Sequence, residues 1–150
     1  MSAVMMKRDL LLHVSLLDER AKVLADNALY LELAVNRMKL GYLPEVLLKY
    51  RWHGANLSRN PGVLMEDASG VYDRFWESHA GDLSADLRAR ARRWRSHWHL
   101  QTAIDAILHG DRARARRHIV KAACINPLSI RPGWIRMLGV GSPPSGPWSE

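Results

Sequence analysis

The sequence predicts a predominantly α-helical α/β protein with only a few strands. Three observations indicate this fold class. An apolar, β-favouring run at 43–50 precedes a polar loop that contains glycine. The residues before that run have apolar side chains at helical spacing. After the breaker Asn60-Pro61-Gly62, helical patterns continue almost to the end of the chain.

The first sixty residues should alternate between strand and helix. We expect a short strand at 2–8 and a short helix at 10–14, with Asp9 as its N-cap. A turn over 15–20 follows. A second helix should run from about Asp26 to Lys39, because Leu29, Leu33 and Ala34 repeat at helical spacing.

The ends of that second helix have their own signals. Asp26 lies where a carboxylate caps backbone N–H groups, and Gly41 lies where a glycine often follows the last turn. The predicted strand at 43–50 comes next, broken early by Pro44. It leads into a polar corner that contains Arg51, His53, Asn56 and Ser58.

The remainder of the chain should be helical. We expect helices over 63–78, 83–109, 112–124 and 132–138, and a disordered tail over 139–150. Gly110 and Asp111 form a turn between the second and third of these, with Asp111 as an N-cap. The inward residues of the long helix should be Leu87, Ala91, Trp94 and Trp98.

Composition and charge bound the class of protein. A hydrophobic fraction of 47% and a charged fraction of 25% are typical of a soluble globular domain. Cys124 is the single cysteine, so an internal disulfide is excluded. The sequence predicts no signal peptide and no membrane span, and we expect a cytoplasmic protein.

Residues 1–80 hold ten basic and ten acidic side chains, whereas 81–150 hold twelve basic and five acidic side chains. That basic part is either a solvated helix surface or a contact for an anionic partner.

Two places could carry chemistry. Asp26 opens a helix that leads to the polar corner, so it is either a simple N-cap or a general base that takes a proton from a hydroxyl group. In the corner, Arg51 and His53 share a face if the strand continues. Arginine can hold a phosphate or carboxylate, and a neutral imidazole can ligate a metal. The alternative is a capped turn, in which Asn56 and Ser58 satisfy the loop backbone.

The order of these features resembles the second half of the catalytic domain of family 2 glycosyltransferases. The stretch Ser15-Leu16-Leu17-Asp18-Glu19 resembles the family's Gly-Gly-Phe-Asp-Glu turn, and Ala25-Asp26-Asn27-Ala28-Leu29-Tyr30 resembles its Glu-Asp-x-Asp-Leu-Trp helix start. The family's closing motif is matched by Leu43, Leu47, Tyr50, Arg51, His53, Asn56 and Ser58. The resemblance covers about residues 2–61.

The resemblance implies a fold and a reaction. The chain would be the acceptor-side half of a GT-A-like domain over 1–61, with a helical extension over 62–138. The family transfers a sugar from a nucleotide-diphosphate donor to a hydroxyl acceptor with inversion. By resemblance, Asp26 would be the catalytic base, Arg51, Asn56 and Ser58 would bind substrate, and His53 would lie at the metal. A divalent ion, Mg²⁺ or Mn²⁺, would stabilise the departing diphosphate.

The sequence also departs from the family. Ala25, Asn27 and Ala28 replace two acids and an aromatic residue, and Ser15 and Leu16 replace the paired glycines. The chain has no Asp-x-Asp motif and no nucleotide-binding half. It resembles the product of a truncated or split gene, which is expected to be inactive and to bind no metal by itself.

The alternative is a non-enzymatic basic helical module. Its arginines would bind an anionic membrane surface or nucleic acid. In a transferase, the same basic helices would make peripheral contact with the inner face of a membrane, and nucleic acid is the less favoured partner.

Overall fold

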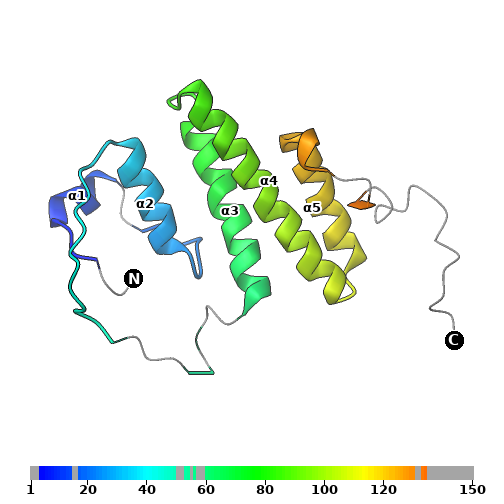
Figure 1. Ribbon diagram of the computed structural model, residues 1–150, viewed down its shortest axis with the longest axis horizontal. Coiled ribbons are helices and arrows are strands. Elements are labelled where there is room, and N and C mark those ends of the chain that lie inside the picture. Colours follow the sequence, from blue (N-terminus) through cyan, green and yellow to red (C-terminus); the bar gives the residue numbers. More distant parts are fainter. Residues whose placement is uncertain are drawn as a thin grey trace, which may run out of the picture. The chain divides into compact units, whose positions relative to one another are not determined.

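The computed structural model describes residues 4–14, 17–49, 53–54, 56, 60–130 and 133–134. The elements in this part of the chain are helices (Figure 1). They are α1 (Arg8–His13), α2 (Ala25–Val35), α3 (Pro61–His79), α4 (Ala85–Leu108), α5 (Arg112–Ile125) and the short 3₁₀ helix η2 (Pro127–Ser129). The chain divides into two compact units, Met1–Ala91 and Arg92–Glu150. The predicted tail over 139–150 lies outside the described residues.

The predicted α/β fold is wrong, because the described residues form no strand. Residues 4–7 are irregular, and α1 begins at Arg8. Residues 43–49 are also irregular, which removes the strand expected of a GT-A-like half (Figure 1). The apolar side chains of this segment are exposed, with Val46 95% exposed. A strand is stable only when it pairs and buries a face, and β propensity alone supplies neither.

Helix α2 ends earlier than Gly41. It stops at Val35, and Arg37 adopts a left-handed conformation with φ of 55°. The N–H of Arg37 donates to the carbonyl of Ala34 at 3.0 Å, and the N–H of Met38 donates to that of Leu33 at 3.0 Å. These two bonds form a Schellman motif, and the Met38 side chain completes it by packing against the cluster that contains Leu33.

The core of the first unit lies on the inward side of α2. Val14, Leu29 and Leu33 are buried there, and partly buried side chains pack around them: Met6, Leu11, Tyr30 and Met38. Helix α2 also contacts α3. Asn60 caps α3 by accepting a hydrogen bond from the N–H of Val63 at 3.2 Å, and Pro61 occupies the first turn. The Asn60-Pro61-Gly62 breaker therefore starts a helix.

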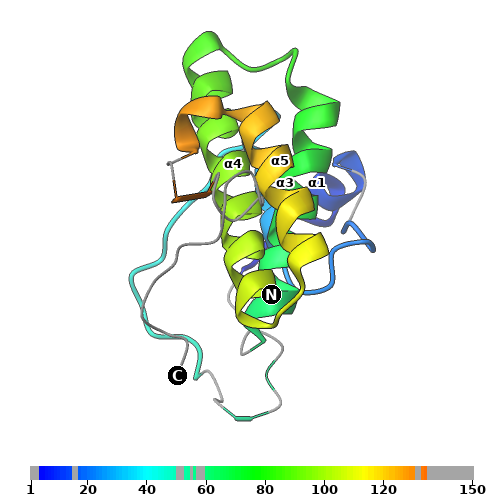
Figure 2. The ribbon, with the colours of Figure 1, turned by 90° about the vertical axis from the view of Figure 1, so that its right-hand side faces the viewer.

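The second unit is an antiparallel helical hairpin (Figure 2). Gly110 turns the chain with φ of 76°, and the Asp111 side chain accepts a hydrogen bond from the N–H of Arg114 at 2.9 Å. Both predictions for this turn are confirmed. The buried face of the hairpin is made mainly of small or polar residues around Ile119 of α5. They are Ser96, His99, Ala103 and Ala106 on α4 and Ala115, His118 and Ala122 on α5.

That face differs from the expected one. Leu87 and Trp94, which should point inward, are 48% and 49% exposed. Small side chains let two helices approach closely, so the hairpin is packed mainly through alanine and serine, while Trp98 is partly buried as expected. The helices within the described residues are each too short or too polar to cross a membrane.

Candidate functional site

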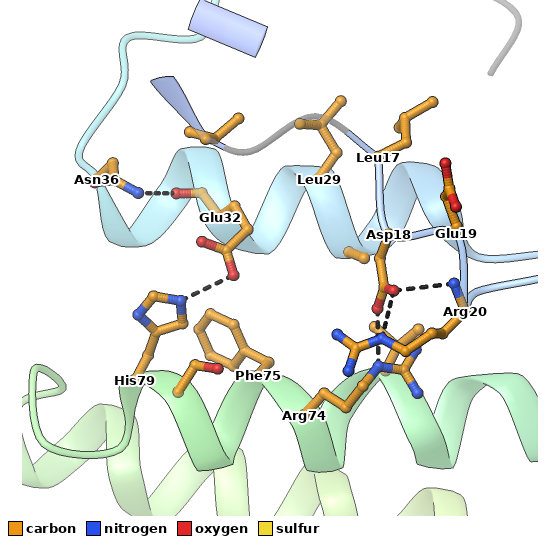
Figure 3. Close-up of a pocket in the computed structure, with 14 residues that line it drawn as sticks. Leu17, Asp18, Glu19, Arg20, Leu29, Glu32, Asn36, Arg74, Phe75 and His79 are labelled. Atoms are coloured by element: carbon orange, nitrogen blue, oxygen red, sulfur yellow. Dashed lines mark hydrogen bonds and ion pairs between the residues drawn. The ribbon is translucent and has the colours of Figure 1, made fainter. Parts of the chain in front are cut away.

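A cavity of the first unit with a polar lining lies beside α2 and α3. Its volume is about 640 Å³. Acidic, basic and aromatic side chains line it together (Figure 3). The charged, imidazole and aromatic side chains that line it are Asp18, Glu19, Arg20, Glu32, Arg74, Phe75 and His79.

An ion-pair network occupies one end of this cavity. The Asp18 carboxylate lies 2.9 Å from Nε of Arg20 and 2.8 Å from Nε of Arg74 on α3 (Figure 3). Burial opposes ionisation of Asp18, but the hydrogen bonds from the side chain and backbone of Arg20 and from Arg74 outweigh it. The pKa of Asp18 is therefore lowered below its ordinary value. This network ties the 17–20 turn to α3.

Arg74 also has unused hydrogen-bonding capacity. Its Nη2 is buried and finds no hydrogen-bond partner among the described residues. Its Nη1 lies 3.0 Å from the position a Cβ would take at Gly70, so any larger residue there would displace the guanidinium. Buried donors of this kind are normally satisfied. Arg74 therefore keeps one buried donor that the described residues leave unsatisfied.

A histidine and a carboxylate occupy the other end. Nε2 of His79 on α3 and Oε1 of Glu32 on α2 are 2.8 Å apart (Figure 3). Nδ1 of His79 lies 3.7 Å from Asp82, and the Phe75 ring packs 5.1 Å from the imidazole. The charged groups of the cavity are thus largely paired with one another.

The start of α2 is held by a residue that the sequence analysis did not select. Asp67 of α3 is buried, and its carboxylate accepts hydrogen bonds from the N–H groups of Lys22, Val23 and Leu24 at 3.0, 2.7 and 2.8 Å. Leu24 is the N-cap of α2 and has no side-chain cap of its own. Asp67 therefore does, from 43 residues away, what an N-cap side chain does locally.

Asp26 has a different position from the expected one. It lies in the first turn of α2, inside the helix, and its Oδ1 accepts a hydrogen bond from the N–H of Asn27 at 2.9 Å. The cavity is lined by Ala28, Leu29, Glu32 and Asn36 of the same helix. At 3.6 residues per turn, Asp26 points about 120° away from Glu32. Asp26 is therefore neither the N-cap nor part of the cavity.

The negative charge of Asp26 affects the pKa of a nearby tyrosine. Burial raises the pKa of Tyr30, and the negative charge of Asp26, one turn earlier, raises it further. The two side chains therefore share the face of α2 that also contains the buried Leu33.

The polar corner is only partly described. His53 is exposed, and its carbonyl accepts a hydrogen bond from the N–H of Asn56 at 3.2 Å, which makes a local turn. Arg51 and Ser58 lie outside the described residues. Within the described part of the chain, no three His, Cys, Asp or Glu side chains gather to hold a metal. The metal role of His53 stays a prediction.

The residues that the sequence analysis missed have a common property. Arg74, His79 and Asp67 lie on α3 and act on groups 43 to 56 residues away. A signal was present, because Asp67 interrupts the apolar face of a helix. Spacing can show that such a residue points inward, but not which backbone group it meets.

The hairpin contains a second polar cluster. His99 and His118 are 1% and 4% exposed, and their Nδ1 atoms are 3.0 Å apart. One ring donates and the other accepts, so one Nδ1 is protonated and the other is not. Oγ of Ser96 donates to the carbonyl of Ala122 at 3.2 Å. These bonds connect α4 to α5.

Comparison with known proteins adds no further restriction: no family model, no curated protein and no solved structure matches this chain. Assignment of function therefore depends on the order of the sequence motifs and on the geometry of the described residues.

Proposed function

We propose that this chain is the acceptor-side part of an inverting family 2 glycosyltransferase. The support is the order of three motifs, at 15–19, 25–30 and 43–58, in a stretch that resembles the second half of such a catalytic domain. The observation that carries the proposal is the position of Asp26, in the first turn of the helix that begins at Ala25, after the 17–20 turn.

In the proposed reaction, the Asp26 carboxylate takes the proton of the acceptor hydroxyl. The acceptor oxygen forms a bond to the anomeric carbon of the donor sugar as the bond from that carbon to the diphosphate breaks. The nucleoside diphosphate leaves with the electron pair of the broken bond. Attack from the opposite side inverts the anomeric centre. The carboxylate is needed because a neutral hydroxyl is a weak nucleophile.

The surroundings of Asp26 fit this role. The first turn of a helix stabilises an ionised carboxylate, because its N–H groups and its dipole present positive charge. Asp26 is half-buried, and its charge reaches the Tyr30 hydroxyl. Arg51, Asn56 and Ser58 would bind the substrate, as their positions in the closing motif suggest.

A divalent metal is part of the reaction in the family, but the described residues do not fit it. His53 is exposed, and no group of three potential ligands is found with it in the described part of the chain. We therefore assign no metal ligand among the described residues. No step of the proposed reaction on this chain uses the metal.

The test is a transfer assay with nucleotide-sugar donors, hydroxyl acceptors and Mg²⁺ or Mn²⁺. The chain is assayed alone and mixed with a separately produced nucleotide-binding half of a family 2 glycosyltransferase. We expect no transfer by the chain alone, transfer by the mixture, and at least a hundredfold loss with Asp26→Asn.

Asp9→Asn is the matched control, because Asp9 also lies in the first turn of a helix. It should leave the rate unchanged. Full activity of the Asp26→Asn variant would show that Asp26 is not the catalytic base. A mixture that never transfers sugar would contradict the proposed function.

A further inference from the structure

The second unit carries the net charge of the protein. Residues 92–150 contain ten Lys or Arg and three Asp or Glu, whereas residues 1–91 contain twelve of each. The excess of seven positive charges is therefore confined to one part of the chain. Such an asymmetry favours an anionic partner for that part.

Much of this charge lies on one face of α5. Arg112, Arg116, Arg117 and Lys121 are exposed, and we call them the cationic face. Val120 lies among them and is 47% exposed. The other side of the helix is buried through Ala115, His118, Ile119 and Ala122. The helix is therefore amphipathic, and its outward side combines cations with an apolar group.

The arginines of this face are available for a ligand. Arg112, Arg116 and Arg117 form no ion pair with another residue that the structure describes, whereas Arg114, on the inward side, pairs with Asp105 at 3.3 Å. The acid nearest to the start of the helix, Asp111, caps the backbone N–H of Arg114. The three arginines of the cationic face are therefore not neutralised by the described residues of this unit.

We propose that the cationic face docks on an anionic phospholipid surface. A helix of 14 residues is about 21 Å long, which suits a position in the plane of the headgroups. Arginine and lysine place their apolar stems on the acyl boundary and their charges among the headgroups, and Val120 points in the same direction.

The composition of α5 favours lipid over nucleic acid. The helix has the sequence RARARRHIVKAACI, and its exposed side offers no Asn, Gln, Ser, Thr or aromatic side chain. Arginine alone can read guanine, but single strands are bound by stacking on aromatic rings, which this exposed side lacks. Lipid headgroups require only positive charge and a shallow apolar contact.

The expected strength follows from the number of charges. Each basic residue near an anionic membrane changes the partition coefficient about fivefold, and the effect is screened within a Debye length. Removal of all four cations should therefore reduce partitioning by several hundredfold, about five to the fourth power. Val120→Ser should weaken it by about threefold.

The experiment is co-sedimentation of the full chain with vesicles of phosphatidylcholine, with and without 30% phosphatidylserine, from about 50 to 500 mM salt. We expect binding to the anionic vesicles only, and its loss at high salt. The variant replaces Arg112, Arg116, Arg117 and Lys121 by Gln. The control replaces Lys7, Arg8, Lys39 and Lys49, which are also exposed, and changes the net charge equally.

Loss of binding in the α5 variant, with retention in the control and unchanged circular dichroism of both, supports the proposal. Equal loss in the two variants, or equal binding to neutral vesicles, would overturn it. So would binding of a duplex DNA or single-stranded RNA probe that is tighter than binding of the anionic vesicles. The readout needs no transferase activity, so it is independent of the transfer assay.

Discussion

Each of the two units is stabilised by its own interactions, and these differ in the sequence distance between the residues that they join. In the first unit, Asp67 and Arg74 of α3 bind groups 43 to 56 residues earlier in the chain. In the hairpin, the corresponding bonds join residues 9 to 33 positions apart. The first unit is electrically neutral and has a polar cavity, whereas the second is strongly basic.

This difference decides which features can be read from the sequence. Gly110 and Asp111 specify the hairpin turn locally, through a left-handed residue and an N-cap. The first unit depends on Asp67, whose partners cannot be found from spacing. The comparison leads to four predictions, which begin with the long-range contacts because their effects should be largest.

Replacement of Asp67 by Ala should destabilise the first unit by about 3 kcal/mol, because three backbone N–H groups lose a charged acceptor. Hydrogen exchange should show faster exchange of the amides of Lys22, Val23 and Leu24. Glu77→Ala, at an exposed position of α3, should have almost no effect. Unchanged protection at 22–24 would contradict the capping role of Asp67.

Replacement of His99 by Phe should destabilise the hairpin by about 2 kcal/mol. The ring is conserved in size, but the imidazole of His118 loses its partner across the hairpin. Urea denaturation measures the loss, with the exposed His97→Phe as the control. The double variant with His118→Phe should recover part of the loss, because neither imidazole is then left facing an apolar ring across the hairpin. If the double variant is as unstable as the sum of the two single variants, the imidazoles do not interact.

Replacement of Arg37 by Gly should stabilise the first unit by about 1 kcal/mol, because a left-handed backbone is costly for a residue with a Cβ. Gly41→Ala is the comparison. A Cβ at Gly41 meets nothing within 4 Å, so this change should be neutral. Thermal unfolding distinguishes the two. A stabilising Arg37→Gly supports the Schellman ending of α2, whereas a destabilising Gly41→Ala would restore the original prediction that Gly41 is the cap.

The smallest effect is the pH dependence from Asp18. Its folded-state pKa is lowered, so its stabilisation is complete above the unfolded pKa near 4 and is lost as the pH falls through the lower folded value. The ion pairs are partly exposed, so the contribution should be less than about 1 kcal/mol. Asp18→Asn should reduce the difference in unfolding free energy between pH 6 and pH 2.5. Glu45→Gln, at an exposed position, should preserve it.

Much of the helical part could be predicted. Helices α3, α4 and α5 begin and end within two residues of the expected positions, because breakers and caps mark them. Asp26 was correctly placed at the beginning of α2, but its role as N-cap was wrong. The cavity could not be predicted, because Asp18, Glu32 and His79 become neighbours only when α3 packs against α2.

The sequence by itself determined the helix limits after Pro61, the hairpin turn at Gly110 and the concentration of positive charge in residues 92–150. These depend on local backbone chemistry and on composition. Only the tertiary structure decided the absence of strands among the described residues, the early end of α2 and the role of Asp67. The physical reason is that a strand, a helix end and a buried carboxylate each need a partner, and that partner is selected by packing and not by neighbours in the chain.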